Sequence, residues 1–236
     1  MVKKQCMPIF WMMGYERMIN VTKYNLGIAL RWNKLLRKMF ILPLKKKKLK
    51  NKDFTLLCNN CAGGILSHDL NLQFRSPTIN LFFYYDHFFK FCENFDYYIA
   101  QPLTVCENPI HTPSCAYPVC NLGDLELHFL HYSSFEEAKQ KWDSRTARID
   151  KDNIFVIWTF FDETDPEWAA RFDKLPFRNK VAFTEKNFPE YPSLFRIRGV
   201  EKVGGVMEFS GLNGRRKIDQ FDYIEWFNQG RIHAES

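Results

Sequence analysis

Residues 54–64 read FTLLCNNCAGG, an apolar run that leads into a polar turn and two glycines. The segment that follows alternates apolar and polar residues and predicts a helix from about Gly63 to Leu72. Cys61 is therefore expected in a turn between a strand and a helix. In an open α/β sheet such a turn faces solvent beside unpaired helix N–H groups. We interpret Cys61 as a candidate nucleophile, because these groups favour the thiolate.

Strands and helices alternate along the rest of the chain. Strands are predicted at 54–58, 78–83, 125–132, 154–160, 180–184 and 194–200, and helices at 63–72, 86–98, 134–149, 164–175 and 219–228. The run 154–160 is apolar without alternation, which is typical of a strand buried on both faces. Residues 102–118 contain several prolines and are expected to be irregular. We expect an α/β fold, a mostly parallel sheet with helices on both faces.

The charge of the chain is unevenly distributed. Residues 1–52 hold 14 Lys and Arg against 1 acid, whereas the remaining 184 residues hold 19 against 26. Apolar and aromatic residues lie between the basic ones, as in an amphipathic helix at a membrane interface. We predict a basic N-terminal segment at 1–51, helical or partly disordered, a single domain at 52–230 and a tail at 231–236. A solvated tail or a later start codon are the alternatives for the first segment.

The composition also bears on location and partners. No uncharged run approaches the roughly 20 residues that span a bilayer, and no secretory leader pattern is present. Seven cysteines without a leader indicate a reducing compartment. We expect a cytoplasmic protein, peripheral on the inner face of the plasma membrane through residues 1–52, with no nucleic acid partner. Cys58 and Cys61 have the spacing of a redox pair, and Cys115 with Cys120 could complete a zinc site, but we expect no bound metal.

The turn around Cys61 supplies candidate binding groups. Asn59 and Asn60 carry amides that donate without adding charge, and Gly63 and Gly64 allow close backbone approach. Such groups can hold an oxyanion or a phosphate. The alternative is that these residues only build the turn and that Cys61 packs beneath it.

Two histidines are candidate bases. His128 and His131 lie three residues apart in a strand-like run that also contains Glu126. A strand places Glu126 and His128 on one face and His131 on the other, so the three converge only at a bend or a helical turn. Either histidine could remove the proton of Cys61, although a core role is the alternative for both. Asp69, in the helix after Cys61, is a further acid or base candidate.

Charged residues elsewhere suggest ligands of other kinds. Arg145 and Arg148 lie three apart on one predicted helix and could clamp a phosphate or a carboxylated sugar, although a solvated basic face is the alternative. Asp162 and Asp165 follow a buried strand, where a metal-dependent glycosyltransferase would hold its ion.

Several blocks between about Lys52 and Gly230 resemble a bacterial domain-of-unknown-function family found in exopolysaccharide and capsule gene clusters. The blocks are FTLLCNNCAGG at 54–64, DLNLQFRSPT at 69–78, YPVCNLGDLELHFLHY at 117–132, EAKQKWDSRTARI at 137–149, LPFRNKVAFT at 175–184 and DQFDY at 219–223. The Asn-Asn-Cys turn is also loosely similar to the Gly-Asn-Cys turn of a coenzyme A binding, capsule-modifying acetyltransferase family. The chain departs from the first family's pattern at Ala62, where an aromatic residue is usual, and at Cys120, where glycine is common.

The resemblance implies a bacterial exopolysaccharide biosynthesis protein that acts on a polysaccharide or a lipid-linked glycan. Together with the candidate site, it leads us to expect a transferase that moves an acyl group from coenzyme A to a glycan. The CoA thioester is then a cosubstrate, and no permanently bound cofactor is expected. The alternatives are a metal-dependent glycosyltransferase that uses a nucleotide sugar and a non-catalytic glycan-binding or scaffold subunit.

Overall fold

A computed structural model describes residues 30–111, 115–159, 166–200, 211 and 213–229. Asp162, Asp165 and the predicted tail lie outside the described residues. No helix in the described ranges is long and apolar enough to cross a membrane.

The main sheet has four parallel strands. They are β1 (Thr55–Cys58), β5 (Ile154–Thr159), β6 (Asn179–Thr184) and β7 (Leu194–Arg196), in the order β1-β5-β6-β7. All six residues of β5 are buried, as the unbroken apolar run predicts. The expected mostly parallel sheet is thereby confirmed.

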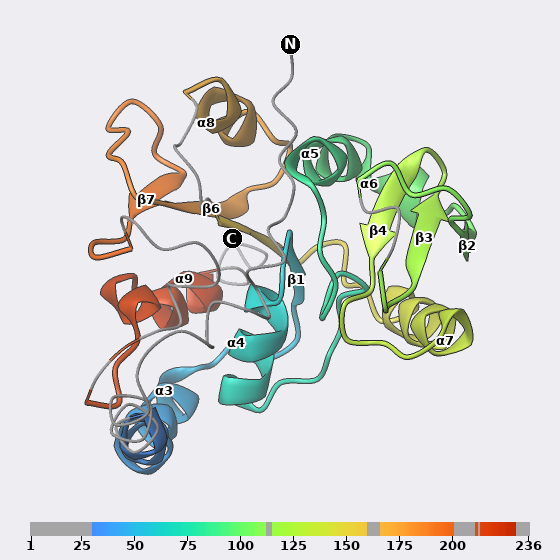
Figure 1. The fold of residues 1–236 in the computed structure, drawn as a ribbon. Coiled ribbons are helices and arrows are strands. Elements are labelled where there is room, and N and C mark those ends of the chain that lie inside the picture. Colours follow the sequence, from blue (N-terminus) through green and yellow to red (C-terminus); the bar gives the residue numbers. More distant parts are fainter. Residues whose placement is uncertain (1–29, 112–114, 160–165, 201–210, 212, 230–236) are drawn as a thin grey trace, which may run out of the picture.

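Helices cover both faces of this sheet. In Figure 1, α4 (Ala62–Leu70) and α9 (Tyr223–Gln229) lie below the strands, and α5 (Tyr85–Glu93) and α8 (Pro166–Asp173) lie above them. Side chains of successive strand residues alternate between two hydrophobic clusters, one shared with α4 and α9 and the other with α5 and α8. Each face of the sheet is therefore part of a hydrophobic core.

A second, smaller sheet is antiparallel. Its strands are β2 (Leu103–Val105), β3 (Val119–Leu122) and β4 (Leu125–His128), in the order β2-β3-β4. Helix α6 (Phe95–Ile99) precedes it, and α7 (Phe135–Thr146) follows it and packs nearby (Figure 1). Ser134 caps α7 by accepting a hydrogen bond from the Glu137 N–H.

Three sequence predictions were wrong in this region. The strand expected at 125–132 ends at His128 and belongs to the antiparallel sheet. The strand expected at 78–83 consists of turns and one bridge, between Phe82 and His128. The stretch at 102–118, expected to be irregular, contains strand β2, which pairs with β3.

A basic helix is fixed to the domain by one buried arginine. Residues 30–36 are α-helical and continue into η1 (Arg37–Ile41), a π-helical stretch, and α3 (Leu42–Lys48). Arg37 is 2% exposed, and its guanidinium donates to Asp69 and, at 2.8 Å, to Asp219 on η3 (Lys217–Gln220). Buried charge needs such partners, so these ion pairs hold the helix against α4 and η3.

Candidate active site

The structure brings Cys61 and His131 together at the carboxyl end of the parallel sheet. The distance from Cys61 Sγ to His131 Nε2 is 3.1 Å, although 70 positions separate the two residues. Cys61 is the residue that immediately precedes α4, and His131 lies in the turn after β4. Cys61 is buried, whereas His131 is exposed to solvent. This arrangement pairs a buried thiol with an exposed imidazole.

Two asparagines fix the turn that carries Cys61. The Asn59 side-chain oxygen accepts a hydrogen bond from the Thr159 N–H at 3.1 Å, which joins the ends of β1 and β5. The Asn60 amide donates to the Thr159 hydroxyl at 2.6 Å, and its oxygen accepts from the Ala62 N–H at 2.9 Å. Both predicted binding residues therefore position Cys61 through contacts within the protein.

The two glycines allow α4 to start close to its neighbours. A Cβ on Gly63 would lie 2.9 Å from the Cys58 sulfur, and a Cβ on Gly64 would overlap the Asn80 side chain. Their N–H groups lie in the first turn of α4, where a helix supplies no internal acceptor. The glycines thus serve packing, and their N–H groups are suited to a developing negative charge.

Buried neighbours hold the turn that carries His131. Tyr132 is 7% exposed and its hydroxyl donates to the Ile79 carbonyl at 3.1 Å. Arg145 on α7 donates to the same hydroxyl at 2.6 Å and to the Ile79 carbonyl at 2.9 Å. Arg145 is itself 7% exposed, so the structure places it as a support for the residue beside His131. Arg148 is exposed and donates to the Phe74 carbonyl.

Burial keeps the thiol protonated in the resting protein. Desolvation raises the pKa of Cys61 to about 11, because the thiolate loses hydration in a buried site. A thiol with this pKa does not ionise at neutral pH by itself. The chemistry available to the pair is therefore attack by sulfur while the neighbouring imidazole removes its proton.

The other predicted acid and base groups lie elsewhere. His128 and Glu126 are both buried on β4, and His128 Nε2 lies 2.8 Å from the Glu126 carboxylate. Burial lowers the pKa of His128, and the nearby Glu126 carboxylate opposes that shift. Asp69 lies eight residues after Cys61, about 12 Å along a helix axis. Its carboxylate is paired with Arg37 and Arg216.

A third cluster lies outside the residues that the sequence indicates and contains ligands suited to a metal ion. Asp86 and His87 in the first turn of α5 and His111 in a loop bring their ligand atoms within 4.8 Å of one another. The adjacent Asp86 and His87 are a weak sequence indication of a metal site, and no sequence spacing indicates that His111 joins them. Among the described residues, none of the cysteines forms a disulfide.

Two comparisons place the chain among known sequences. The family model described as "Domain of unknown function (DUF1919)" matches residues 32–228. A Haemophilus influenzae (strain ATCC 51907 / DSM 11121 / KW20 / Rd) protein called "Uncharacterized protein" is 42% identical over 195 residues, which cover 81% of this chain and 92% of that protein. The match begins before Lys52 and therefore includes the helix that carries Arg37.

Proposed function

The chain belongs to the family described as Domain of unknown function (DUF1919), and we propose that it transfers an acyl group from coenzyme A to a glycan through Cys61. The observation that carries this proposal is the 3.1 Å contact between Cys61 Sγ and His131 Nε2. The glycan acceptor and a role in bacterial exopolysaccharide or capsule synthesis rest on the resemblance of the dispersed sequence blocks.

The first step forms an acyl-enzyme. Cys61 sulfur attacks the carbonyl carbon of the CoA thioester while its proton moves to His131 Nε2. The N–H groups of Gly63 and Gly64 are suited to stabilise the resulting oxyanion. The carbon–sulfur bond to CoA then breaks, and His131 returns the proton to the departing CoA thiolate. An acyl group remains on Cys61.

The second step regenerates the thiol. A glycan hydroxyl attacks the acyl carbon, and His131 removes the hydroxyl proton. The bond between the acyl carbon and Cys61 breaks, and the Cys61 thiolate takes the proton from His131. His131 is exposed, so an acceptor as large as a glycan can approach it.

The basic helix at 30–48 supports action at an anionic membrane surface. Arg37 fixes the helix to the domain, while large apolar residues along the helix are exposed: Leu30, Trp32, Leu35, Met39, Phe40 and Leu44. Exposed lysines lie beside them, at 34, 38 and 46–48. Apolar side chains that enter the interface and cations that meet anionic headgroups are the two contributions that bind such helices to lipid.

The donor is tested by thermal shift of the full chain with acetyl-CoA, CoA and nucleotide sugars with and without Mn²⁺, since a bound ligand raises the melting temperature. The proposal predicts a shift with acetyl-CoA and CoA. A shift only with a nucleotide sugar and Mn²⁺ would favour glycosyl transfer instead. No shift with any donor would favour a glycan-binding or scaffold role.

The residues are tested by CoA release from acetyl-CoA in the presence of acceptor oligosaccharides. His131→Ala is expected to lower the rate by about 100- to 10,000-fold, because a general base is lost. Cys61→Ala should lose as much or more, whereas Cys115→Ala, a matched cysteine outside the pair, should retain the wild-type rate. If Cys61→Ala stays active while His131→Ala does not, the glycan hydroxyl attacks the thioester directly.

The membrane contact is tested by sedimentation of the full chain with anionic and neutral vesicles. Trp32→Ser should weaken binding to anionic vesicles about tenfold, since an interfacial aromatic side chain is lost. Tyr97→Ser is the matched control, because Tyr97 and Trp32 are both 59% exposed. Equal binding by the two variants would assign any lipid contact to a part of the chain other than the 30–48 helix.

A further inference from the structure

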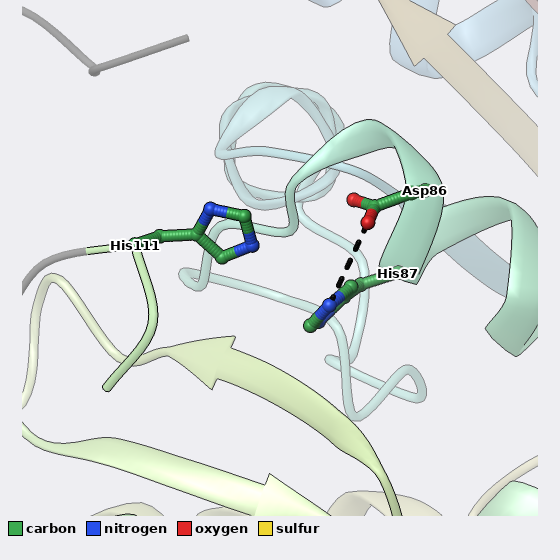
Figure 2. A group of neighbouring side chains, drawn as sticks. All are labelled: Asp86, His87 and His111. Carbon is green, nitrogen blue, oxygen red and sulfur yellow. Dashed lines mark ion pairs between the residues drawn. The ribbon is translucent and has the colours of Figure 1, made fainter. Parts of the chain in front are cut away.

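Asp86, His87 and His111 converge on one point beside the antiparallel sheet. Figure 2 shows His111 reaching from its loop toward the first turn of α5, where Asp86 and His87 lie. His87 Nε2 is 3.7 Å from the Asp86 carboxylate, and each pair of ligand atoms in the group is within 4.8 Å. The group therefore gathers two imidazoles and one carboxylate from two distant parts of the chain.

The His111 ring presents a buried nitrogen to this point. Its Nε2 is shielded from solvent, and among the described residues no hydrogen-bond partner reaches it. Tyr84 stacks on the ring with 3.7 Å between the two centroids, which fixes the ring plane. A buried nitrogen without a partner is costly, and coordination of a cation is one way to satisfy it.

The backbone of Glu126 contacts the other nitrogen of the His87 ring. The Glu126 N–H donates to His87 Nδ1 at 2.7 Å, so the neutral ring carries its proton on Nε2. Coordination through Nε2 requires the ring to exchange this hydrogen bond for a proton on Nδ1. Metal-bound histidines commonly donate that proton to a backbone carbonyl, and the Glu126 carbonyl oxygen lies 3.3 Å from Nδ1.

Carboxylates lie on the side of the cluster that faces β4 and favour a cation there. The Glu126 carboxylate is buried and accepts hydrogen bonds from the Ile110 and His111 N–H groups, so it ties the His111 loop to β4. His87 and Glu126 also line a cavity of about 420 Å³, together with Glu107 and Asp124.

We propose that Asp86, His87 and His111 bind one divalent transition-metal ion, with Zn²⁺ as the best fit to two imidazole nitrogens and one carboxylate oxygen. Ligand bonds of about 2.0–2.2 Å place tetrahedral ligand atoms about 3.4 Å apart, so the side chains close slightly around the ion. Asp86 is exposed and able to rotate for this closure. Three protein ligands leave a fourth position for water or an oxygen ligand beside the cavity.

This site is separate from the acyl-transfer pair. None of its three ligands is a partner of Cys61 or His131 in the structure. Metal binding can therefore succeed or fail without deciding the proposed acyl transfer.

The test is titration of the full, reduced, chelator-treated chain with Co²⁺, followed by visible absorption, and with Zn²⁺ in competition with a chelating dye. We expect one ion per chain and a cobalt spectrum without a thiolate charge-transfer band. His87→Ala and His111→Ala should each lower the affinity by about 100-fold or more, since even loss of an outer-shell partner costs 10- to 100-fold. Asp86→Asn should weaken binding less.

His68→Ala is the matched control, because His68 is an exposed histidine on α4 and should leave the affinity unchanged. Cys61→Ala should also bind as wild type. The proposal is overturned if the wild-type chain binds neither ion, if a thiolate band dominates the spectrum, or if His111→Ala retains wild-type affinity. Circular dichroism of each variant establishes that it is folded before the affinities are compared.

Discussion

Two histidines three residues apart have opposite environments. His128 is 1% exposed and lies on β4, where the Glu126 carboxylate is 2.8 Å from its Nε2. His131 is exposed in the following turn, where its Nε2 is 3.1 Å from the sulfur of Cys61. The same residue type therefore contributes to structure in one place and is available for chemistry in the other.

The difference follows from where the strand ends. Residues two apart on a strand share a face, so Glu126 and His128 meet on β4. The strand stops at His128, and the buried Phe129 and Tyr132 hold the turn that presents His131 to the parallel sheet. His128 is buried together with its carboxylate partner and serves the structure, whereas His131 lies exposed beside the buried thiol of Cys61 and can be reached by other molecules.

The largest effect is expected on the His128 side. Glu126→Ala removes the buried carboxylate that contacts His128 and accepts from the Ile110 and His111 N–H groups. We expect a loss of about 3–5 kcal/mol of unfolding free energy, because His128 and two backbone N–H groups lose their partner and each buried polar group left unpaired costs about 1–3 kcal/mol. Urea denaturation measures it, and Glu136→Ala, at an exposed acid on α7, is the control. If Glu126→Ala lost less than about 1 kcal/mol of unfolding free energy, His128 would not have the structural role that distinguishes it from His131.

A second prediction concerns stability at alkaline pH. The folded pKa of Cys61 is about 11, above the ordinary value of 9.0, so the folded protein holds the proton more tightly than the unfolded chain. This contribution is fully present below pH 9 and declines as the pH rises to 11. Between pH 8 and 11 the wild type should lose about 2 kcal/mol more than Cys61→Ala. Parallel losses in the two proteins would mean that Cys61 is more hydrated than its burial indicates.

A third prediction concerns the close contact at the start of α4. Gly64→Ala forces a Cβ into the Asn80 side chain, so the helix or residue 80 must shift. We expect a loss of about 1–3 kcal/mol, typical of overpacking, and a slower reaction of Cys61 with iodoacetamide. Gly199→Ala is not a suitable control for the close contact at Gly64, because Gly199 has a φ of +81° and its substitution would strain the backbone instead. Unchanged stability and thiol reactivity would show that the close approach is dispensable.

The smallest stability effect is expected at His131. His131→Ala removes an exposed side chain, so its unfolding free energy should stay within about 0.5 kcal/mol of wild type. Its rate of acyl transfer should nevertheless fall by about 100- to 10,000-fold, because the general base is lost. A stability loss comparable to that of Glu126→Ala would place His131 in the structural class with His128.

The sequence predicted the parallel sheet and the Cys61 turn because these depend on local pattern. A short apolar run before Asn-Asn-Cys, followed by glycines, allows few structures other than a strand, a turn and a helix. The two candidate histidines were also identified from the sequence, but the choice between them depends on where β4 ends. That boundary is set by pairing with β3, which no local pattern shows.

Partners distant in sequence account for what could not be predicted. Arg37 sits in a basic run that resembles a solvated face, and only the fold reveals that Asp69 and Asp219 neutralise it. Arg145 was interpreted as a binding residue, yet its guanidinium reaches the Ile79 carbonyl. The metal-binding cluster also depends on a loop, since His111 is distant in sequence from α5.

A covalent role for Cys61 is tested most directly by a search for an acyl group on its sulfur. The full chain is mixed with acetyl-CoA without an acceptor, quenched in acid and measured by intact-mass and peptide mass spectrometry. Acyl transfer through Cys61 predicts one added acetyl group on the peptide that contains this residue, greatly reduced in His131→Ala and lost when the acceptor glycan is added. An unmodified Cys61 in a chain that still consumes acetyl-CoA when the glycan is present would contradict it.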